Sequence, residues 1–321
     1  MTQPAISDDA IELSAPDITA YEDGNCGLPY VWRFDSGQAG PHVMVSAVVH
    51  GNEICGAIAL DFLLREQVRP RRGRLTLAFV NVEAYRRFDP ANPTVTRYVD
   101  EDFNRLWAPE TLEGPRDSVE LRRARALRPL LDEVDFLLDI HSMQHKTPPL
   151  MMAGPQPKGR ALAGAIAIPG IVVSDAGHAA GRRMRDYAGF AEAESPKNAL
   201  LIECGQHWEA AAGPLAIETA LRFLRHFEMI DESFAAPYLS APPPEQRFIE
   251  VTGPVTIETE RFRFAEPYRG LETIAKAGTV IGHDGERPVT TPYDDCVLIM
   301  PSRRLRRGES AVRFGRYVSA G

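Results

Sequence analysis

Apolar residues recur through the first two thirds of the chain in short continuous runs that alternate with longer amphipathic stretches. Short apolar runs bounded by turn residues are typical of buried strands, whereas helices show a spacing of about 3.6 residues. We predict strands at 43–49, 75–81, 136–140, 171–174 and 200–203, and helices at 54–64, 118–131 and 217–230. This alternation predicts an α/β fold with a sheet that is at least partly parallel and helices on both of its faces.

A proline-rich stretch then interrupts the alternation. It includes three consecutive prolines at 242–244, which cannot continue a helix. Beyond it, short β-type segments are separated by glycine, proline and aspartate turns, at 248–251, 255–258, 262–264, 279–281 and 297–300. We therefore predict a large domain over 1–235, a linker over 236–247 and a small all-β domain over 248–321.

Composition and charge narrow the class of protein. Of the 321 residues, 44% are hydrophobic and 25% are charged, which is ordinary for a globular chain. The formal net charge of -8 argues against a nucleic-acid partner, because nucleic-acid binders normally carry a basic surface.

Neither an export signal nor a membrane span is evident in the sequence. The first residues lack a basic start and an apolar core, and no apolar run approaches the roughly 20 residues that cross a bilayer. The four cysteines are widely spaced, which is typical of free thiols in a reducing compartment. We expect a cytoplasmic protein with no membrane partner.

Two histidines and a glutamate carry the strongest chemical signal. His50 and Glu53 lie three residues apart between a predicted strand and a predicted helix, and His141 follows another predicted strand. The carboxyl ends of strands in open α/β sheets are where ligands gather. Two imidazoles and a carboxylate are the protein ligands of a catalytic zinc ion that keeps one position open for water. The spacing alone leaves three other histidines as alternative ligands: His145, His178 and His207.

Each of these pieces also has a plain structural interpretation. Asn52 and Glu53 suit the start of a helix, as a cap and as a carboxylate at the positive end of the helix dipole. Asp139 shares a strand face with His141, so it can orient that imidazole without itself binding the metal, but the pair also fits a polar strand end. The zinc interpretation therefore depends on the presence of His50, Glu53 and His141 in the same chain, not on any one of them alone.

Two further regions carry groups suited to an acidic substrate and to proton transfer. Residues 96–105 contain two arginines, which bind carboxylates through paired hydrogen bonds and can stabilise an oxyanion near a metal. Glu203 ends an apolar strand, so we expect burial to raise its pKa toward the range of a general base and acid. A charged surface loop and an exposed strand-end glutamate are the plainer alternatives. Cys204 and His207 lack an obvious third group for thiol catalysis.

Together these motifs resemble the succinylglutamate desuccinylase and aspartoacylase family, a branch of the zinc carboxypeptidase fold. His50, Glu53 and His141 match its zinc ligands. Glu203 with Gly205 matches its catalytic Glu-x-Gly. The matching positions of its substrate segment are Arg97, Tyr98, Asp102, Asn104 and Arg105. The resemblance implies a mixed sheet flanked by helices, with the small β domain capping the active site.

The resemblance also implies a zinc-dependent amidohydrolase that removes the acyl group from a small N-acyl amino acid. One zinc ion per subunit would be held by the three ligands, with Asp139 in support. Glu203 would move the protons, and Arg97 would stabilise the oxyanion. Asn104 and Arg105 would bind the substrate carboxylate. The expected partner is thus a small-molecule amide, and homo-oligomer formation stays open.

Two departures from the family pattern concern the substrate. Family members that act on acidic amino acids carry an arginine shortly before the catalytic glutamate, but residues 191–194 read Ala-Glu-Ala-Glu. The tyrosine that the small domain of aspartoacylase contributes has no counterpart in residues 302–305. Three arginines are candidate replacements for the missing arginine: Arg182, Arg183 and Arg185. Of these we take Arg183 as a substrate-binding residue.

Two other functions fit the same features. A metallocarboxypeptidase would use this zinc site to remove a C-terminal residue from a peptide, although a capped cleft admits only small substrates. A non-catalytic binding protein would keep the fold without turnover, but every expected catalytic position is filled in this sequence.

Overall fold

The computed structural model describes residues 10–177 and 180–319, so His178 lies outside the described chain. The chain divides into two compact units. Unit 1 comprises Met1–Phe103, Arg116–Ser142 and Cys204–Ser240, and unit 2 comprises Asn104–Pro115, Met143–Glu203 and Ala241–Gly321.

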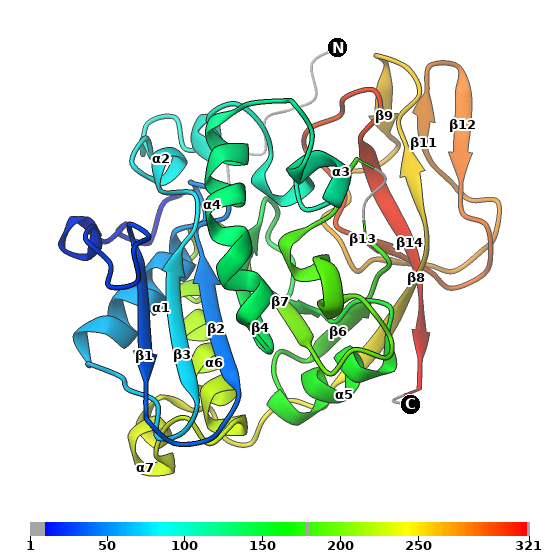
Figure 1. The fold of residues 1–321 in the computed structure, drawn as a ribbon. Coiled ribbons are helices and arrows are strands. Elements are labelled where there is room, and N and C mark those ends of the chain that lie inside the picture. The colour runs from blue at the N-terminus through cyan, green and yellow to red at the C-terminus, as the bar shows by residue number, and fades with distance from the viewer. Residues whose placement is uncertain (1–9, 178–179, 320–321) are drawn as a thin grey trace. The chain divides into compact units, whose positions relative to one another are not determined.

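The strands of unit 1 lie side by side in the order β1-β3-β2-β4 (Figure 1). Their bounds are Val31–Asp35 for β1, His42–Ala47 for β2, Arg74–Phe79 for β3 and Phe136–Met143 for β4. Strand β2 runs parallel to both β3 and β4, whereas the edge strand β1 is antiparallel to β3. The sheet is therefore mixed and partly parallel, as the sequence predicts.

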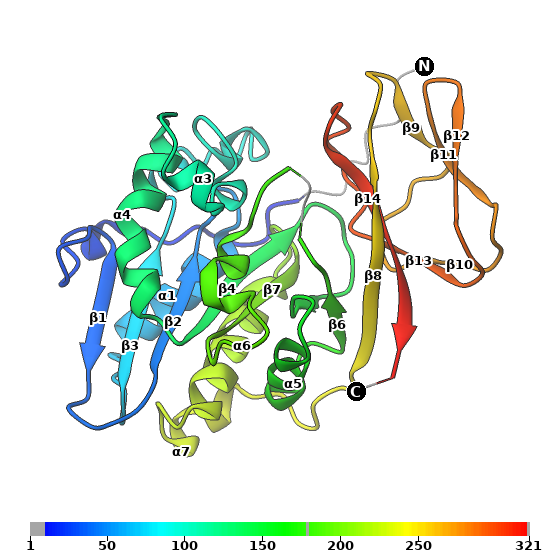
Figure 2. The ribbon, with the colours of Figure 1, turned by 45° about the vertical axis from the view of Figure 1, so that its right-hand side comes forward.

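Helices cover both faces of these strands (Figure 2). Helices α1 (Ile54–Arg65) and α6 (Ala212–His226) pack together on one face, and α4 (Val119–Glu133) lies on the other. Every residue of β2 is buried as a result. The predicted α/β class with helices on both faces is confirmed. The remaining helices of unit 1 are short: α2 (Val82–Tyr85) and α7 (Glu232–Ala235).

Helix α1 begins directly after the turn that follows β2, and Glu53 is its N-cap residue. Gly56 lies in its first turn. A Cβ atom there would meet Ala47 Cβ at 2.7 Å and Ile140 Cγ2 at 3.2 Å. The missing side chain therefore lets the start of α1 lie against β2 and β4. This close approach fixes where Glu53 stands beside the two strands.

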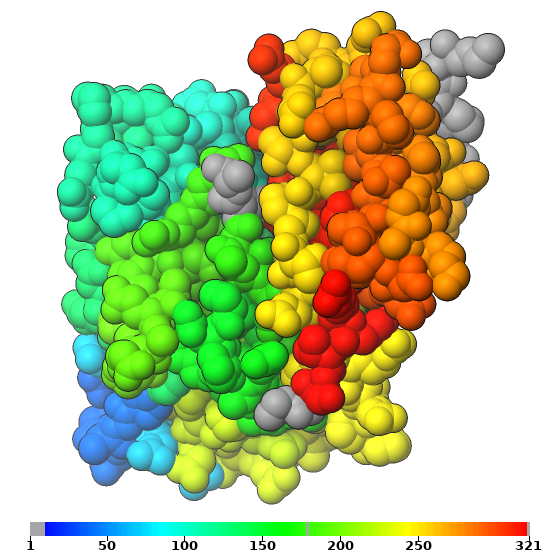
Figure 3. Space-filling view, turned by 90° about the vertical axis from the view of Figure 1, so that its right-hand side faces the viewer, coloured from blue at the N-terminus to red at the C-terminus, as the bar shows by residue number. Residues whose placement is uncertain are grey.

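In unit 2 the strands follow the order β7-β5-β6-β8-β14-β13-β10, with a second, smaller sheet β12-β11-β9. Their bounds are β5 (Leu150–Met152), β6 (Ile171–Ser174), β7 (Asn198–Gln206), β8 (Arg247–Thr256), β9 (Phe262–Phe264), β10 (Thr273–Ile274), β11 (Val280–Asp284), β12 (Arg287–Thr290), β13 (Cys296–Ile299) and β14 (Ser310–Val318). Among the described residues of unit 2, the α-helices are α3 (Pro109–Leu112) and α5 (Pro157–Ile166), and Met184–Asp186 and Ala188–Phe190 form short 3-10 helices. Figure 3 shows one face of the C-terminal strands, coloured yellow to red.

Strands from before and after the proline-rich stretch share one apolar core in unit 2. Leu150, Leu201 and Ile249 belong to the same buried cluster, and β8 pairs in parallel with β6. The C-terminal antiparallel β region that the sequence predicts is present, whereas the predicted domain boundaries stay a prediction. Within the described chain, no helix combines the length and the apolar character needed to cross a lipid bilayer.

Strand β8 differs from its sequence prediction, which placed two strands at 248–251 and 255–258. Gly253 and Pro254 favour a break, because proline cannot donate a ladder hydrogen bond. Strand β6 pairs with β8 only over residues 247–250, so Pro254 lies beyond this neighbour. On the other side, the register with β14 shifts near Gly253. The strand therefore continues through a position that local sequence marks as a turn.

His42 at the start of β2 makes the stability of the fold depend on pH. Its Nε2 lies 2.8 Å from Thr76 Oγ1 in a buried pair. Burial lowers the pKa of His42 to about 4, and the charge of Arg74 acts in the same direction. The unfolded chain binds this proton near pH 6.5. The folded state therefore loses stability relative to the unfolded state as the pH falls from about 6.5 toward 4.

We expect His42→Gln to remove this contribution. Between about pH 7 and pH 4.5, the wild-type protein should lose about 2 kcal/mol more free energy of unfolding than the variant. Urea unfolding of both proteins at the two pH values measures the difference. Equal losses of unfolding free energy in the two proteins would show that His42 does not cause the pH dependence.

Candidate metal centre and substrate residues

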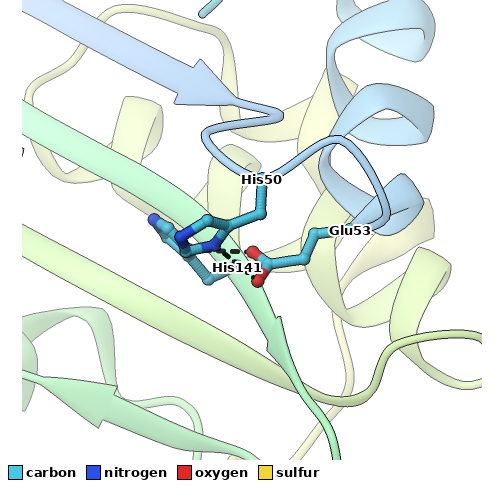
Figure 4. A group of neighbouring side chains, drawn as sticks. All are labelled: His50, Glu53 and His141. Carbon is cyan, nitrogen blue, oxygen red and sulfur yellow. Dashed lines mark hydrogen bonds and ion pairs between the residues drawn. The ribbon is translucent and has the colours of Figure 1, made fainter. Parts of the chain in front are cut away.

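Three side chains from separate elements of unit 1 point to one centre (Figure 4). His50 lies in the turn after β2, Glu53 stands before α1 and His141 lies on β4. Glu53 Oε1 is 2.7 Å from His50 Nδ1, and Glu53 Oε2 is 2.8 Å from His141 Nδ1. All three are buried, with their potential ligand atoms within 4.8 Å of one another. In the part of the chain that the structure describes, this is the one such group of three.

Two aspartates hold the far sides of the imidazole rings. Asp139 Oδ2 lies 2.8 Å from His141 Nε2, and its Oδ1 accepts a hydrogen bond from Ser46 Oγ at 2.6 Å. Asp102 Oδ1 lies 3.0 Å from His50 Nε2. When each Nε2 carries the proton and donates it to an aspartate, each Nδ1 carries no proton. Its lone pair is then available to bind a metal. The contact of Asp139 is the one that its predicted supporting role requires.

Arg97 adds a positive charge beside this group. Its Nη1 lies 3.3 Å from Glu53 Oε1, and its Nη2 lies 3.2 Å from Asp102 Oδ2. Its Nη2 is also 2.8 Å from His50 Nε2, a contact that is a hydrogen bond only when that nitrogen carries no proton. The tautomer that frees Nδ1 puts the proton on Nε2, so the guanidinium then pairs with the two carboxylates. Its position suits the predicted oxyanion role.

The charges around the centre suit a divalent cation. The centre contains three carboxylates, those of Glu53, Asp102 and Asp139, and the guanidinium of Arg97, which pairs with the first two. Two negative charges remain among these side chains when both imidazoles are neutral. Two nitrogen donors and one carboxylate oxygen also fit a divalent transition metal. The residues present therefore fit a bound metal in both donor type and charge.

The pKa shifts of Glu53 and His141 indicate which of these two groups is charged. Burial raises the pKa of Glu53, but attraction to His50 and His141 outweighs burial and holds it well below its ordinary value. Burial lowers the pKa of His141, yet the carboxylates of Asp139 and Glu53 raise it well above its ordinary value. A proton on His141 thus supplies positive charge beside Glu53. Metal binding at His141 would release that proton.

The two alternative histidines within the described chain have other neighbours. His207 Nδ1 lies 2.9 Å from Ser142 Oγ, and His145 Nδ1 lies 3.3 Å from Arg303 Nε. Neither histidine belongs to a group of three potential ligands among the described residues. Among the described residues, the geometry therefore favours His50, Glu53 and His141 over His145 and His207.

The other predicted site residues lie in unit 2. Glu203 is a buried residue of β7. Asn104 Oδ1 accepts a hydrogen bond from Met184 N at 2.8 Å, and Arg105 Nη1 donates to Asn104 O at 2.7 Å. The side-chain oxygen of Asn104 thus holds the backbone, and Arg105 is tied to the same residue. Substrate binding by Asn104 and Arg105 stays a prediction.

Arg183 is buried between two aspartates. Its Nε lies 2.5 Å from Asp186 Oδ2, and its Nη1 lies 3.1 Å from Asp175 Oδ2. Burial opposes its charge, but the two carboxylates raise the pKa of Arg183 above its ordinary value. These ion pairs favour a supporting role for the guanidinium. Substrate binding by Arg183 stays a prediction.

Arg313 is a buried arginine of β14 that the sequence pattern did not reveal. Its Nε lies 3.5 Å from Asp175 Oδ2. Burial lowers the pKa of Arg313 to about 10, and the charge of Asp175 opposes this shift. The charges of Arg105 and Glu203 also act on its pKa, so both lie within electrostatic range of this guanidinium. The β-branched and aromatic residues Val312, Phe314, Tyr317 and Val318 are the signal that could have predicted its strand.

Together, the fold and the centre define an α/β protein with a buried His-Glu-His group able to hold a metal. The profile of the succinylglutamate desuccinylase/aspartoacylase catalytic domain matches residues 39–230, which is more than half of the chain. The chain therefore belongs to this family, as its motifs predict.

Solved structures with this fold cover most of the chain. Succinylglutamate desuccinylase from Vibrio cholerae has a TM-score of 0.67 at 19% identity, over 90% of this chain and 86% of that one. A succinylglutamate desuccinylase/aspartoacylase from Rhodobacter sphaeroides gives 0.59 at 20%, over 88% and 87%. The ectoine utilization protein EutE (DoeB) from Ruegeria pomeroyi, with product bound, gives 0.56 at 21%, over 87% and 86%. No curated protein matches the sequence.

Loss of the Glu53 carboxylate should remove the metal. Glu53→Ala deletes the one anionic ligand between the imidazoles, so bound zinc should fall from about one ion per chain to less than about a tenth of that. Metal analysis after zinc loading and dialysis measures the occupancy. Full occupancy in this variant would contradict the ligand assignment.

Two further variants serve as comparisons for zinc binding by Glu53→Ala. Asp139→Asn keeps the ligands but weakens the support of His141, so zinc affinity should fall about 10- to 100-fold. Glu83→Ala removes an exposed carboxylate in α2 and should leave occupancy unchanged.

Proposed function

We propose that the protein is a zinc-dependent hydrolase that removes the acyl group from a small N-acyl amino acid by cleaving a linear amide bond. The observation that carries this proposal is the buried group of His50, Glu53 and His141 in a chain of this family. We propose zinc, one ion per chain, because two imidazoles and a carboxylate leave a position open for water. The names of the similar structures, several of them desuccinylases, agree with acyl removal.

Zinc, when bound, would lower the pKa of a water molecule and polarise the amide carbonyl. The guanidinium of Arg97 would stabilise the negative charge that develops on the carbonyl oxygen. Glu203 would accept the proton of the attacking water and pass it to the leaving amine nitrogen. Arg105, held by its bond to the Asn104 carbonyl, would bind the substrate carboxylate. The products are a carboxylic acid and a free amino acid.

Two alternative functions use the same ligand group. A metallocarboxypeptidase would remove a C-terminal residue from a peptide, and a binding protein would hold a metal and a ligand without turnover. The family of the chain favours the deacylase over the first alternative. The presence of Glu203 and Arg97 at the expected positions favours catalysis over the second.

A substrate panel tests the proposed function. Zinc-loaded protein is incubated with formyl, acetyl and succinyl derivatives of acidic, neutral and basic amino acids, and with short peptides, while amine release is measured. We expect hydrolysis of N-acyl amino acids and none of the peptides. Cleavage of peptides alone would favour the carboxypeptidase, and no release across the panel would contradict the deacylase.

Glu203→Gln should separate metal binding from catalysis. The amide keeps the shape of the side chain but cannot accept a proton, so kcat should fall by about a thousandfold while bound zinc stays near one ion per chain. Steady-state kinetics and metal analysis on the same sample give both values. Glu192→Gln, an exposed glutamate that precedes β7, is the matched control. A rate near that of the wild type in Glu203→Gln would remove Glu203 from the mechanism.

Arg183→Ala distinguishes two roles for this arginine. The ion pairs with Asp175 and Asp186 hold the segment whose Met184 N–H binds Asn104, so KM should rise for acidic and neutral substrates by a similar factor. Kinetics with N-acyl derivatives of both kinds measure the factor. A rise in KM that is confined to acidic substrates would instead show that Arg183 binds the acidic side chain of the substrate.

A further inference from the structure

A fully buried carboxylate, that of Glu120, lies in the first turn of α4. Three consecutive backbone N–H groups donate to it: Val99 N at 2.6 Å, Asp100 N at 3.0 Å and Glu101 N at 3.3 Å. Asn81 Nδ2 donates from 3.2 Å as a fourth contact. A carboxylate that accepts consecutive backbone N–H groups fixes the path of that backbone. Glu120 therefore binds the turn at residues 99–101.

Other contacts tie the same turn to the start of α4. Asp100 Oδ2 accepts from Val119 N at 2.8 Å, so the loop and the helix each donate a backbone N–H to a carboxylate of the other. Arg116 Nη2 lies 3.0 Å from Glu101 Oε2. Ser118 caps the helix by accepting from Leu121 N at 3.0 Å. Hydrogen bonds in both directions and an ion pair thus hold residues 99–101 against the first turn of α4.

The residues on either side of this turn reach the candidate metal centre. Arg97 lies just before it and contacts Glu53, and Asp102 lies just after it and contacts His50. Gly51 N also donates to Arg97 O at 2.9 Å, which joins the start of this segment to the turn between the ligands. The position of residues 99–101 therefore sets where both side chains stand.

We propose that Glu120 is a positioning residue of the metal centre: by binding the N–H groups of residues 99–101, it holds Asp102 against His50 and Arg97 against Glu53. It acts through Asp102 on the orientation of an imidazole and through Arg97 on the charge beside the ligands. It touches neither metal nor substrate. The part that concerns Arg97 as an oxyanion partner rests on the proposed function, whereas the part that concerns Asp102 rests on the ligand group alone.

The alternative role for Glu120 is to stabilise the fold alone. The two roles differ in what they change. A residue that only stabilises the fold lowers the melting temperature and leaves the zinc affinity of the folded molecules unchanged. A positioning residue loosens the orientation of His50 and Arg97, so it weakens zinc affinity and kcat in molecules that remain folded.

Glu120→Gln in the full-length, zinc-loaded protein tests the proposal. The amide keeps one acceptor oxygen but turns an NH₂ group toward backbone N–H donors. We expect faster hydrogen exchange at the amides of residues 99–101 and a fall in zinc affinity of about 10- to 100-fold, measured by competition with a chelator. We also expect a lower kcat with a smaller change in KM. Glu133→Gln, an exposed glutamate at the other end of α4, is the matched control and should change none of these values.

Asp100→Asn is the second variant, because the buried substitution alone could prevent folding. Asp100 is exposed, and its loss weakens only the reciprocal bond to Val119 N. We expect a few-fold loss of zinc affinity with an unchanged melting temperature. Zinc affinity equal to that of the wild type in both variants, with faster exchange at 99–101, would overturn the proposal.

These readouts remain informative if the proposed function fails. A wild-type protein that binds zinc but hydrolyses no amide would contradict the deacylase. Zinc affinity and hydrogen exchange would still decide whether Glu120 positions the centre.

Discussion

The carboxylate of Glu53, held between the Nδ1 atoms of two buried imidazoles, is the interaction on which the rest of the centre depends. A carboxylate taken out of water costs much free energy unless opposite charge compensates it. Here the neighbouring imidazoles compensate the charge of Glu53, and a bound metal would compensate it in the same place. Asp102 and Asp139 then fix the rings so that the nitrogens facing Glu53 are the ones able to bind a metal.

The fold supplies this geometry through two parallel strands and one close helix. Strands β2 and β4 are neighbours, so the turn after one and the end of the other come together. Gly56 lets α1 lie against both, which brings Glu53 between the histidines. The pairing of β2 with β4 and the close approach of α1 thus bring His50, Glu53 and His141 together. Hydrogen bonds to Asp102 and Asp139, and the loop that carries Arg97, then orient these side chains.

The clustering of His50, Glu53 and His141 was predictable from the order of strands and motifs along the chain. A strand followed by His-x-x-Glu and a helix, and a second strand ending in Asp-x-His, already place the donors at one sheet edge. The class of fold followed from the same alternation. The contacts of Glu120 and Arg183 were not predictable, since they join side chains to segments far away in the sequence or within a loop without periodicity. Strand β8 was divided wrongly because the sequence does not show that Pro254 lies beyond the end of β6, where its missing N–H interrupts no pairing with that strand.

Anomalous diffraction at the zinc edge from crystals of the zinc-loaded protein is the most direct measurement of the central claim. The geometry predicts one zinc ion bonded to Nδ1 of His50, Nδ1 of His141 and a carboxylate oxygen of Glu53, at about 2.0–2.2 Å. The two Nε2 atoms should remain against Asp102 and Asp139. A zinc ion bonded through Nε2, or held by other residues, would contradict this account of the centre.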